Sequence, residues 1–429
     1  MTKLGLIVVD PGHFHAALAQ KEMYPNVAET VHVYAPVGPD IVDYLTRIAR
    51  FNTRAEMPTR WQLEVHAGGD FLDRLASERP GDAAIFAGRN HEKIAMIARA
   101  VEAGLHVLAD KPMIVRRDQL SALSDVLDRA AAKGFVVQDM MGGRQEITRS
   151  LTRLLHADQE IFGEQVAGSA TEPGVAMTSV HHLMKMVAGL PNPRPPWYFD
   201  VRQQGDALAD IGTHLVDRVH GTLFPDLTLN AARDIRVEAV RRWPIMLDFG
   251  QFRQVTGVAD WPDYLGEAVA GGTLAYQCNA HLDYAVRGIH VGLGMLWEWL
   301  EPPGGGDTHT ETWRGTRARI ELRHGPAEGW KPQLYVVPGD NTGAEIGAAL
   351  ERRIAALAET HAGLDLERQG EAWKIVIPDA LRIGHDAHFH ELTKGFLARV
   401  ERREALSKAE IANLIAKYFV TTAAEAAAH

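Results

Sequence analysis

The sequence predicts an α/β protein with an N-terminal, doubly wound parallel sheet and a C-terminal α+β domain whose sheet is open and mostly antiparallel. Two observations lead to this fold class. Strand and helix patterns alternate from residue 3 to residue 139, which is typical of a parallel sheet with crossover helices. After residue 142 long amphipathic strands appear and helices return at the end. Because 429 residues exceed one ordinary core, we expect two domains, residues 1–142 and 143–429.

The first domain begins with a nearly continuous apolar run over residues 3–9, as expected of a strand buried on both faces. A break at residues 10–12 precedes a helical pattern that starts near Ala16. The remaining strands are expected at 30–34, 83–87, 107–109 and 135–139, and the helices at 92–103 and 117–133.

The second domain begins with a helix over 144–157 that leads out of the first domain. Its clearest strands are expected at 271–280 and 317–323, and its last helices at 388–402 and 408–427. The prolines between residues 191 and 196 predict a rigid loop, since each proline fixes its own φ and restricts the preceding residue.

Composition limits the classes of function. The chain has 45 Lys and Arg against 55 Asp and Glu, a formal net charge of −10, which argues against a nucleic-acid surface. No apolar run approaches the ~20 residues of a membrane span, and the N-terminus enters a strand without a signal segment. The single cysteine, Cys278, fits a reducing compartment. We therefore expect a cytoplasmic protein with no nucleic-acid or membrane partner.

Two short segments carry the strongest chemical signal. Lys111 and Pro112 follow a predicted parallel strand, at the edge of the sheet where ligands bind. Asp210 and His214 are four residues apart, which places them on one face of a helix. An amine, a carboxylate and an imidazole can together move a proton on and off a substrate hydroxyl. The alternatives are a solvated loop lysine, a helix-capping aspartate and a core histidine.

A weaker signal lies in the first strand-to-helix turn, Asp-Pro-Gly-His-Phe-His at residues 10–15. A nucleotide pyrophosphate would rest at this position, but only Gly12 remains to permit a close approach of the backbone.

Side chains between residues 181 and 198 are candidates for substrate binding. His181 and Lys185 suit an anionic or polyhydroxylated ligand, and Trp197, next to Tyr198, suits stacking on a sugar or on nicotinamide. Adjacent strand residues point to opposite faces, so we expect only one of His181 and His182 to line a pocket. Ordinary packing with a surface lysine is the alternative.

A histidine-rich stretch contains His385, Asp386, His388 and His390. Its spacing matches neither His-Glu-x-x-His nor a clean i, i+4 pair of ligands. We interpret it as a polar helix start and predict no metal site.

The order of these segments resembles the glucose–fructose oxidoreductase and inositol dehydrogenase family (Gfo/Idh/MocA). The resemblance rests on Ala-Gly-Leu-His-Val-Leu-Ala-Asp-Lys-Pro at 103–112 and Gly-Asp-Ala-Leu-Ala-Asp-Ile-Gly-Thr-His at 205–214, and it covers about residues 3–220. It implies an NAD(P)-dependent enzyme with a Rossmann domain and an oligomerising C-terminal sheet, as a dimer or tetramer. It implies that Lys111, Asp210 and His214 are catalytic. The cofactor would be bound by Gly12, His13, Phe14, Gly88, Asn90, Asp110, Lys111 and Pro112.

The chain also departs from the family pattern. The first two glycines of the fingerprint are absent, and no acid ends the second strand at residues 33–36 to hold the adenosine ribose. Asp110 replaces the usual Glu before the lysine, and Lys93 replaces a histidine beyond Asn90. With the turn at 10–15 and the run at 194–200, these departures resemble a divergent branch with its own oxidoreductase C-terminal domain.

The leading hypothesis is hydride transfer between NAD, with NADP not excluded, and a secondary alcohol of a sugar, glycoside or polyol. His214 or Lys111 would remove the hydroxyl proton, and Asp210 would orient the imidazole. One alternative is an NAD-dependent glycosidase or lyase that oxidises C3 transiently, eliminates the glycosidic oxygen and reduces the ketone again. Another is a ligand sensor without catalysis.

Overall fold

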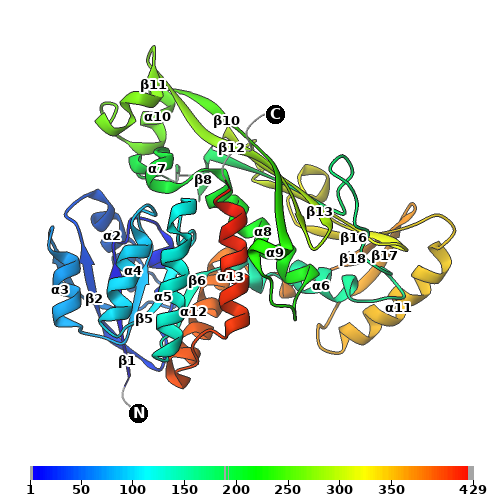
Figure 1. Cartoon of the computed structure of the whole chain (residues 1–429), viewed down its shortest axis with the longest axis horizontal. Coiled ribbons are helices and arrows are strands. Elements are labelled where there is room, and N and C mark those ends of the chain that lie inside the picture. The colour runs from blue at the N-terminus through cyan, green and yellow to red at the C-terminus, as the bar shows by residue number, and fades with distance from the viewer. Residues whose placement is uncertain (1–2, 188–189, 192, 424–429) are drawn as a thin grey trace. The chain divides into compact units, whose positions relative to one another are not determined.

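The computed structural model describes residues 3–187, 190–191 and 193–423, which form two compact units (Figure 1). Unit 1 contains the described residues up to 143 together with 195–205 and 384–422. Unit 2 contains the described residues of 144–194, residues 206–383 and residue 423. Two segments that follow residue 143 in the sequence therefore belong to unit 1.

Unit 1 is built on a parallel sheet. Among its described residues the strands lie in the order β3-β2-β1-β4-β5-β6, and all neighbours are parallel. The strands are β1 (Leu4–Val9), β2 (Val27–Ala35), β3 (Gln62–Ala67), β4 (Ala83–Phe86), β5 (His106–Asp110) and β6 (Val137–Met140). This is the order of a Rossmann sheet, whose ligand-binding switch point lies between β1 and β4.

Helices cover both faces of this sheet. One face packs against α1 (His15–Leu18), α2 (Pro39–Thr53) and α12 (His385–Arg402). The other packs against α3 (Phe71–Glu78), α4 (Lys93–Glu102), α5 (Leu120–Ala132) and α13 (Lys408–Thr421). Both faces of the central strands are therefore buried, which explains the continuous apolar run of β1.

The two C-terminal helices join unit 1 because they complete its core. Phe396 of α12 is fully buried in one cluster, and Tyr418 of α13 is fully buried in the other. The Lys417 ammonium lies 2.5 Å from the Asp139 carboxylate at the end of β6. Figure 1 shows α13, in red, beside α5. The predicted helix over 408–427 ends at residue 421, and its residues 424–427 lie outside the described part.

Unit 2 contains a large, mostly antiparallel sheet. Its main path in the described residues is β10-β12-β13-β7-β14-β15-β16-β18-β17, and only β13 and β7 run parallel. The first half comprises β7 (Val175–Met184), β10 (Ile235–Asp248), β12 (Thr273–Val286), β13 (Ile289–Leu300) and β11 (Val269–Ala270), which pairs with β12. The second half comprises β14 (Thr308–Arg314), β15 (Ala318–His324), β16 (Gln333–Pro338), β17 (Asp365–Gln369) and β18 (Ala372–Val376). The predicted fold class is confirmed.

The helices of unit 2 include α6 (Ile147–His156), α8 (Thr213–Leu223), α9 (Ala231–Asp234), α10 (Phe249–Thr256) and α11 (Gly343–Ala358). A buried ion pair joins α8 to β14, since Arg218 Nε lies 2.6 Å from Glu311 Oε1. The Trp313 indole N–H also donates to Glu311, at 3.0 Å. Burial alone would raise the pKa of Glu311, but the Arg218 guanidinium and the His309 imidazole hold it at about 2.

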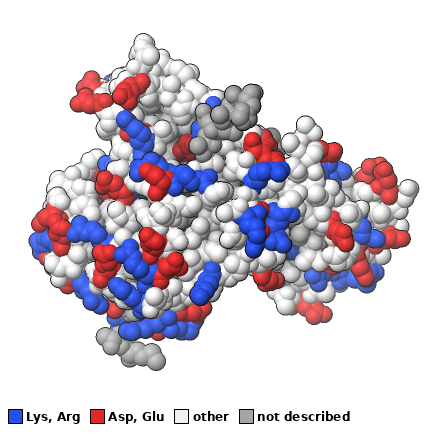
Figure 2. Space-filling view, in the orientation of Figure 1, with Lys and Arg blue, Asp and Glu red and all other residues white. Residues whose placement is uncertain are grey.

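The surface mixes charges of both signs. On the face drawn in Figure 2, lysines and arginines alternate with aspartates and glutamates. Within the described ranges, no helix combines the length and the apolar character that a bilayer crossing requires. The rigid loop predicted at 191–196 includes residue 192, which lies outside the described residues.

Candidate active site

The turn between β1 and α1 lies at the carboxyl edge of the unit 1 sheet. Asp10 has a left-handed backbone conformation, with φ of 45°, and its carbonyl accepts from the Gly12 N–H at 2.8 Å. The His13 N–H donates to the Ala87 carbonyl at 2.7 Å. These bonds fix the turn against the end of β4. They also use the backbone N–H groups of Gly12 and His13. In a glycine-rich fingerprint, amides of this turn bind the pyrophosphate.

Gly88 follows β4 and makes a close approach to this turn. A Cβ atom at residue 88 would lie 2.1 Å from the Asp10 carbonyl oxygen and 2.3 Å from its carboxylate. The next residue, Arg89, donates its backbone N–H to the same carboxylate at 3.2 Å. Burial raises the pKa of Asp10, and the Arg89 charge opposes this shift. The close approach of Asp10 therefore requires glycine at residue 88.

Gly12 faces a tryptophan and an aspartate within unit 1. A Cβ atom at residue 12 would lie 3.0 Å from the Trp197 ring and 3.2 Å from the Asp40 carboxylate. The Trp197 indole N–H donates to Asp40 at 2.8 Å, and the Arg89 guanidinium lies 3.2 Å from Asp40 and 5.3 Å from the centre of the Trp197 ring. Trp197 and Tyr198 are both buried. Their predicted contact with substrate stays a prediction.

The sequence patterns did not indicate Asp40 or Arg89 as site residues. Asp40 lies in the first turn of α2, a few residues beyond the end of β2, where a Rossmann fold carries its ribose-binding acid. Burial raises the pKa of Asp40, and Arg89 opposes this shift. Asp40 could have been recognised by its position, because it is an acidic residue that follows the second strand about 25 residues beyond the β1 turn.

Lys93 fixes the loop that carries Lys111. Its ammonium is almost fully buried, and it donates to the carbonyl oxygens of Asp110 at 2.9 Å and Pro112 at 3.3 Å. It also donates to the side-chain oxygen of Asn90. Asn90 in turn donates to the Gln204 carbonyl at 2.7 Å. Asn90 thus holds a lysine and a neighbouring segment of unit 1 in this structure.

Lys111 follows the last residue of β5 and is 8% exposed. The peptide bond between Lys111 and Pro112 is cis. Because β5 is an inner strand of the parallel sheet, Lys111 lies at the carboxyl edge, as predicted from the sequence.

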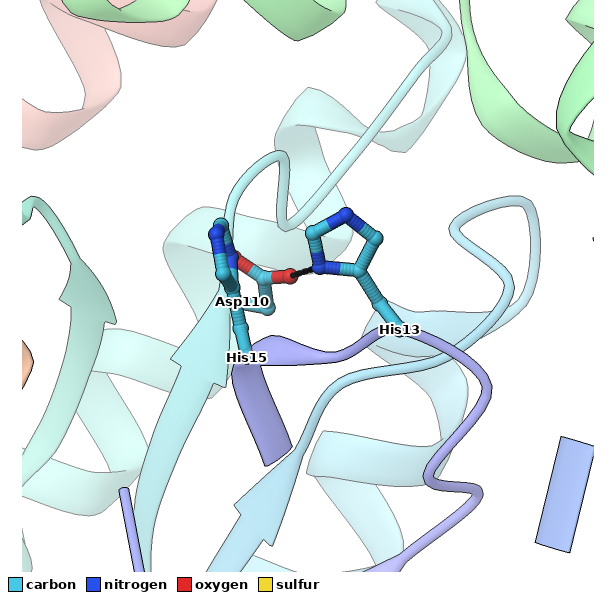
Figure 3. A group of neighbouring side chains, drawn as sticks. All are labelled: His13, His15 and Asp110. Carbon is cyan, nitrogen blue, oxygen red and sulfur yellow. Dashed lines mark hydrogen bonds and ion pairs between the residues drawn. The ribbon is translucent and has the colours of Figure 1, made fainter. Parts of the chain in front are cut away.

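Asp110 lies between two imidazoles, as Figure 3 shows. His13 Nδ1 is 3.0 Å from one carboxylate oxygen, and His15 Nδ1 is 2.9 Å from the other. The Phe14 ring lies 4.5 Å from each imidazole, measured between ring centres. Although burial alone would raise the pKa of Asp110, the two imidazoles hold it well below its usual value.

In unit 2, Asp210 and His214 lie on consecutive helical segments. Asp210 belongs to a π-helical turn, η4 (Leu208–Gly212), and His214 to the first turn of α8. Asp210 is 8% exposed and His214 is half-buried. A π turn is wider than an α turn and is frequent at functional sites. Gly212 permits this packing, because a Cβ there would lie 3.2 Å from Met295 Sδ.

His181 and Lys185 both contact Asp307, a residue that no sequence motif indicated. Asp307 accepts from His181 Nδ1 at 2.9 Å and from the Lys185 ammonium. The backbone N–H of His182 donates to Asp307 at 3.2 Å, and its Nδ1 lies equally close. Both histidines therefore contact one carboxylate, and which of them lines a pocket stays a prediction.

Burial and the neighbouring charges shift the pKa values of this group. Burial alone would raise the pKa of Asp307, but His181 and Lys185 hold it far below its usual value. Burial lowers the pKa of His181, and Asp307 and Asp210 oppose this shift. Asp307 precedes β14 in a loop of small and polar residues, so no periodicity in the sequence indicated it.

The predicted cofactor residues and Lys111 lie in unit 1, with Trp197 and Tyr198, whereas Asp210, His214, His181 and Lys185 lie in unit 2. Within each unit the structure brings together the groups described above. The combined action of Lys111 with Asp210 and His214 stays a prediction.

Unit 1 is a Rossmann-type unit with a buried lysine after β5, and unit 2 is built on a large, mostly antiparallel sheet. Residues 151–429 match the family described as "Putative oxidoreductase C terminal domain". A crystal structure from Parabacteroides merdae ATCC 43184, described as a "putative oxidoreductase", is 38% identical, with a TM-score of 0.95 over 98% of this chain and 96% of that one. The chain belongs to this oxidoreductase family, a branch of the Gfo/Idh/MocA family indicated by the sequence motifs.

More distant solved structures share the fold. KijD10, a 3-ketoreductase from Actinomadura kijaniata in complex with TDP-benzene and NADP, is 15% identical with a TM-score of 0.57, over 98% of this chain and 96% of that one. GenD2 from gentamicin A biosynthesis, in complex with NAD, is 14% identical with a TM-score of 0.57, over 99% of this chain and 93% of that one. A comparison with curated protein sequences finds no match.

Proposed function

We propose that this protein is an NAD(P)-dependent oxidoreductase that acts on a secondary alcohol of a sugar, glycoside or polyol. The observation that carries the proposal is Lys111, buried at the carboxyl edge of a Rossmann sheet on a loop fixed by the Lys93 ammonium. That edge is where open α/β sheets bind ligands. Membership of an oxidoreductase family supports the same chemistry.

The strand order of unit 1 suits a dinucleotide, although the Gly12 and His13 amides are already bonded at the β1 turn. The strand order places the turns after β1 and β4 at the switch point of the sheet. Asp40 supplies an acid for the adenosine ribose, which favours NAD, although the adjacent Arg89 leaves NADP possible. The complexes of KijD10 with NADP and of GenD2 with NAD support this class of cofactor. When bound, NAD(P) supplies the hydride acceptor.

The proton chemistry would fall to this chain's own side chains. Lys111 or His214 would take the proton of the substrate hydroxyl, and Lys111 would stabilise negative charge on its oxygen. Asp210 would orient the His214 imidazole. A carboxylate beside an imidazole favours one tautomer and stabilises the protonated ring.

The substrate would be polyhydroxylated. The group around Asp307 offers hydrogen-bond donors and acceptors within a small, partly exposed region, which suits neutral hydroxyls. The description of KijD10 as a 3-ketoreductase supports chemistry at a secondary carbon.

A spectrophotometric assay tests the proposal. The purified protein is incubated with NAD or NADP and a panel of sugars, glycosides and polyols, and reduced cofactor is followed by absorbance. On the best substrate, Lys111→Ala and His214→Ala should each lower turnover by on the order of 10²-fold. Lys133→Ala, which changes an exposed lysine of the same unit, is the matched control. Near-normal turnover in both active-site variants would contradict the assignment.

Glycoside cleavage through transient oxidation, the alternative expected from the sequence, gains no support from these relatives. It would show as release of an aglycone without net formation of reduced cofactor. A dimeric or tetrameric state and a cytoplasmic location stay predictions, and light scattering after size-exclusion chromatography tests the first.

A further inference from the structure

His13, His15 and Asp110 form a cluster that takes no part in the proton transfer proposed above. We propose that these three residues bind one divalent transition-metal ion at the carboxyl edge of the unit 1 sheet. Two imidazole nitrogens and one carboxylate oxygen form a ligand set that suits Fe²⁺, Co²⁺ or Zn²⁺. One donor atom from each residue lies within 4.8 Å of the others.

The distances agree with a shared ion. Two neighbouring ligands at ~2.1 Å from one ion lie about 3.0 Å apart in octahedral geometry and about 3.4 Å apart in tetrahedral geometry. The observed separations are 3.0 Å from His13 Nδ1 to Asp110 Oδ2 and 2.9 Å from His15 Nδ1 to Asp110 Oδ1, so each imidazole neighbours its own oxygen of the carboxylate. In Figure 3 the two rings flank the carboxylate from different sides. The donors therefore need only small movements to surround an ion.

Hydrogen bonding accounts for only part of this arrangement. His15 Nδ1 makes a hydrogen bond with Asp110. His13 Nδ1 is buried and lies 3.0 Å from the other oxygen of the same carboxylate, but this contact lacks the geometry of a regular hydrogen bond. A poorly directed contact stabilises a buried nitrogen less than a well-directed hydrogen bond does. A metal ion would use its lone pair, together with the negative charge of Asp110.

The ligands are held on rigid elements, as a metal site requires. Asp110 ends β5 and pairs in register with Met140 of β6, and its carbonyl oxygen accepts from Lys93. The His13 backbone is fixed to Ala87. The His15 ring lies 4.3 Å from the Phe389 ring, measured between centres. Such outer contacts orient first-sphere ligands and strengthen metal binding.

Three protein ligands leave coordination positions for oxygen ligands. The His13 side chain is 17% exposed, whereas the side chains of His15 and Asp110 are 9% and 4% exposed. We therefore place the open positions on the His13 side, where water can enter. Sequence spacing did not reveal the site, since Asp110 is 95 residues from His15.

Cobalt titration tests this site without any measurement of turnover. The full-length protein is freed of metal with a chelator and titrated with Co²⁺, and the visible d–d absorption is followed. We expect saturation at one equivalent and displacement by Zn²⁺. Asp110→Asn, His15→Gln and His13→Ala should each weaken Co²⁺ binding at least 10-fold.

The matched control is His66→Ala. His66 also contacts an aspartate of unit 1, Asp70 at 2.9 Å, but this pair is on the surface. It should leave Co²⁺ binding unchanged. His13→Ala, which changes the most exposed of the three ligands, keeps the test valid if the buried variants do not fold, as checked by circular dichroism.

Two results would overturn the proposal. One is the absence of a stoichiometric Co²⁺ site in the metal-free protein. The other is Co²⁺ binding that folded His13→Ala retains in full. Cofactor binding, measured separately by fluorescence titration with NADH, distinguishes this failure from failure of the proposed oxidoreductase function.

Discussion

The Lys93 ammonium donates to the carbonyl oxygen of Asp110 at 2.9 Å, directly before the lysine proposed to be catalytic. Both residues are buried. The contact joins the first turn of α4 to the end of β5, so the position of Lys111 depends on a second lysine that is remote in sequence. The Lys93 side chain reaches three acceptors in this way.

The first prediction concerns this lysine. Lys93→Met should destabilise the protein by about 1–3 kcal/mol, because it leaves buried acceptors on Asn90, Asp110 and Pro112 without their donor. It should also lower turnover more than it changes KM, since it disturbs the Lys111 loop rather than substrate contacts. Urea unfolding and steady-state kinetics check both effects. Lys133→Met is the control, and an equal loss of stability in it would contradict the argument.

A second prediction concerns the approach of β4 to the first turn. Gly88→Ala should lower stability by about 1–3 kcal/mol or more, since its Cβ would lie 2.1 Å from a backbone oxygen that cannot move easily. Thermal unfolding measures the change. Gly143→Ala, where a Cβ meets no atom within 4 Å, should have little effect. Similar melting temperatures for both variants would show that the turn can shift.

Much of the fold could be predicted from the sequence, because buried parallel strands leave continuous apolar runs. β1, β4 and β5 were found in this way. β3 was missed, since most of its residues are exposed at the edge of the sheet and show no apolar run. The membership of α12 and α13 in unit 1 was also missed. Amphipathic helices indicate that they cover a core, but their pattern does not say which one.

The site could be predicted only where a motif carried it. Lys111 and Asp210 belong to short, recognisable segments. Asp307, Asp40 and Arg89 do not, because each acts through partners that are distant in the sequence. Asp307 gathers two histidines and a lysine from β7 and the residue after it. Contacts of this kind depend on how the strands pair, which the spacing of residues along the sequence does not reveal.

The third prediction is a pH dependence that arises in unit 2. The folded-state pKa of Glu311 is about 2, below its ordinary value of 4.5. The carboxylate therefore contributes stability above about pH 4.5, and this contribution, on the order of 3 kcal/mol, is lost as the pH falls toward 2. Glu311→Gln should be less stable at pH 7, since Arg218 loses its buried partner, and its stability should change less between pH 5 and pH 3.

Urea unfolding at several pH values, followed by tryptophan fluorescence, checks this dependence. Glu172→Gln is the matched control, because Glu172 is an exposed partner of Arg314 and should contribute less than about 1 kcal/mol. Parallel stability curves for wild type and Glu311→Gln would show that another group titrates in this range.

The final prediction concerns Asp307, which holds His181 and Lys185 together. Asp307→Asn removes the negative charge that opposes the lowering of the His181 pKa by burial, so that pKa should fall further. We also expect KM for the proposed substrate to rise about 10-fold with a smaller change in kcat, because the change affects binding groups rather than the proton acceptor.

Histidine NMR titration, with His181→Gln for assignment, measures the change in the His181 pKa. Glu298→Gln is the control, since the exposed Glu298 carboxylate lies 3.5 Å from His182 Nε2. A His181 pKa that rises in Asp307→Asn would reverse the sign of the interaction. It would show that burial and Asp210, rather than Asp307, govern this imidazole.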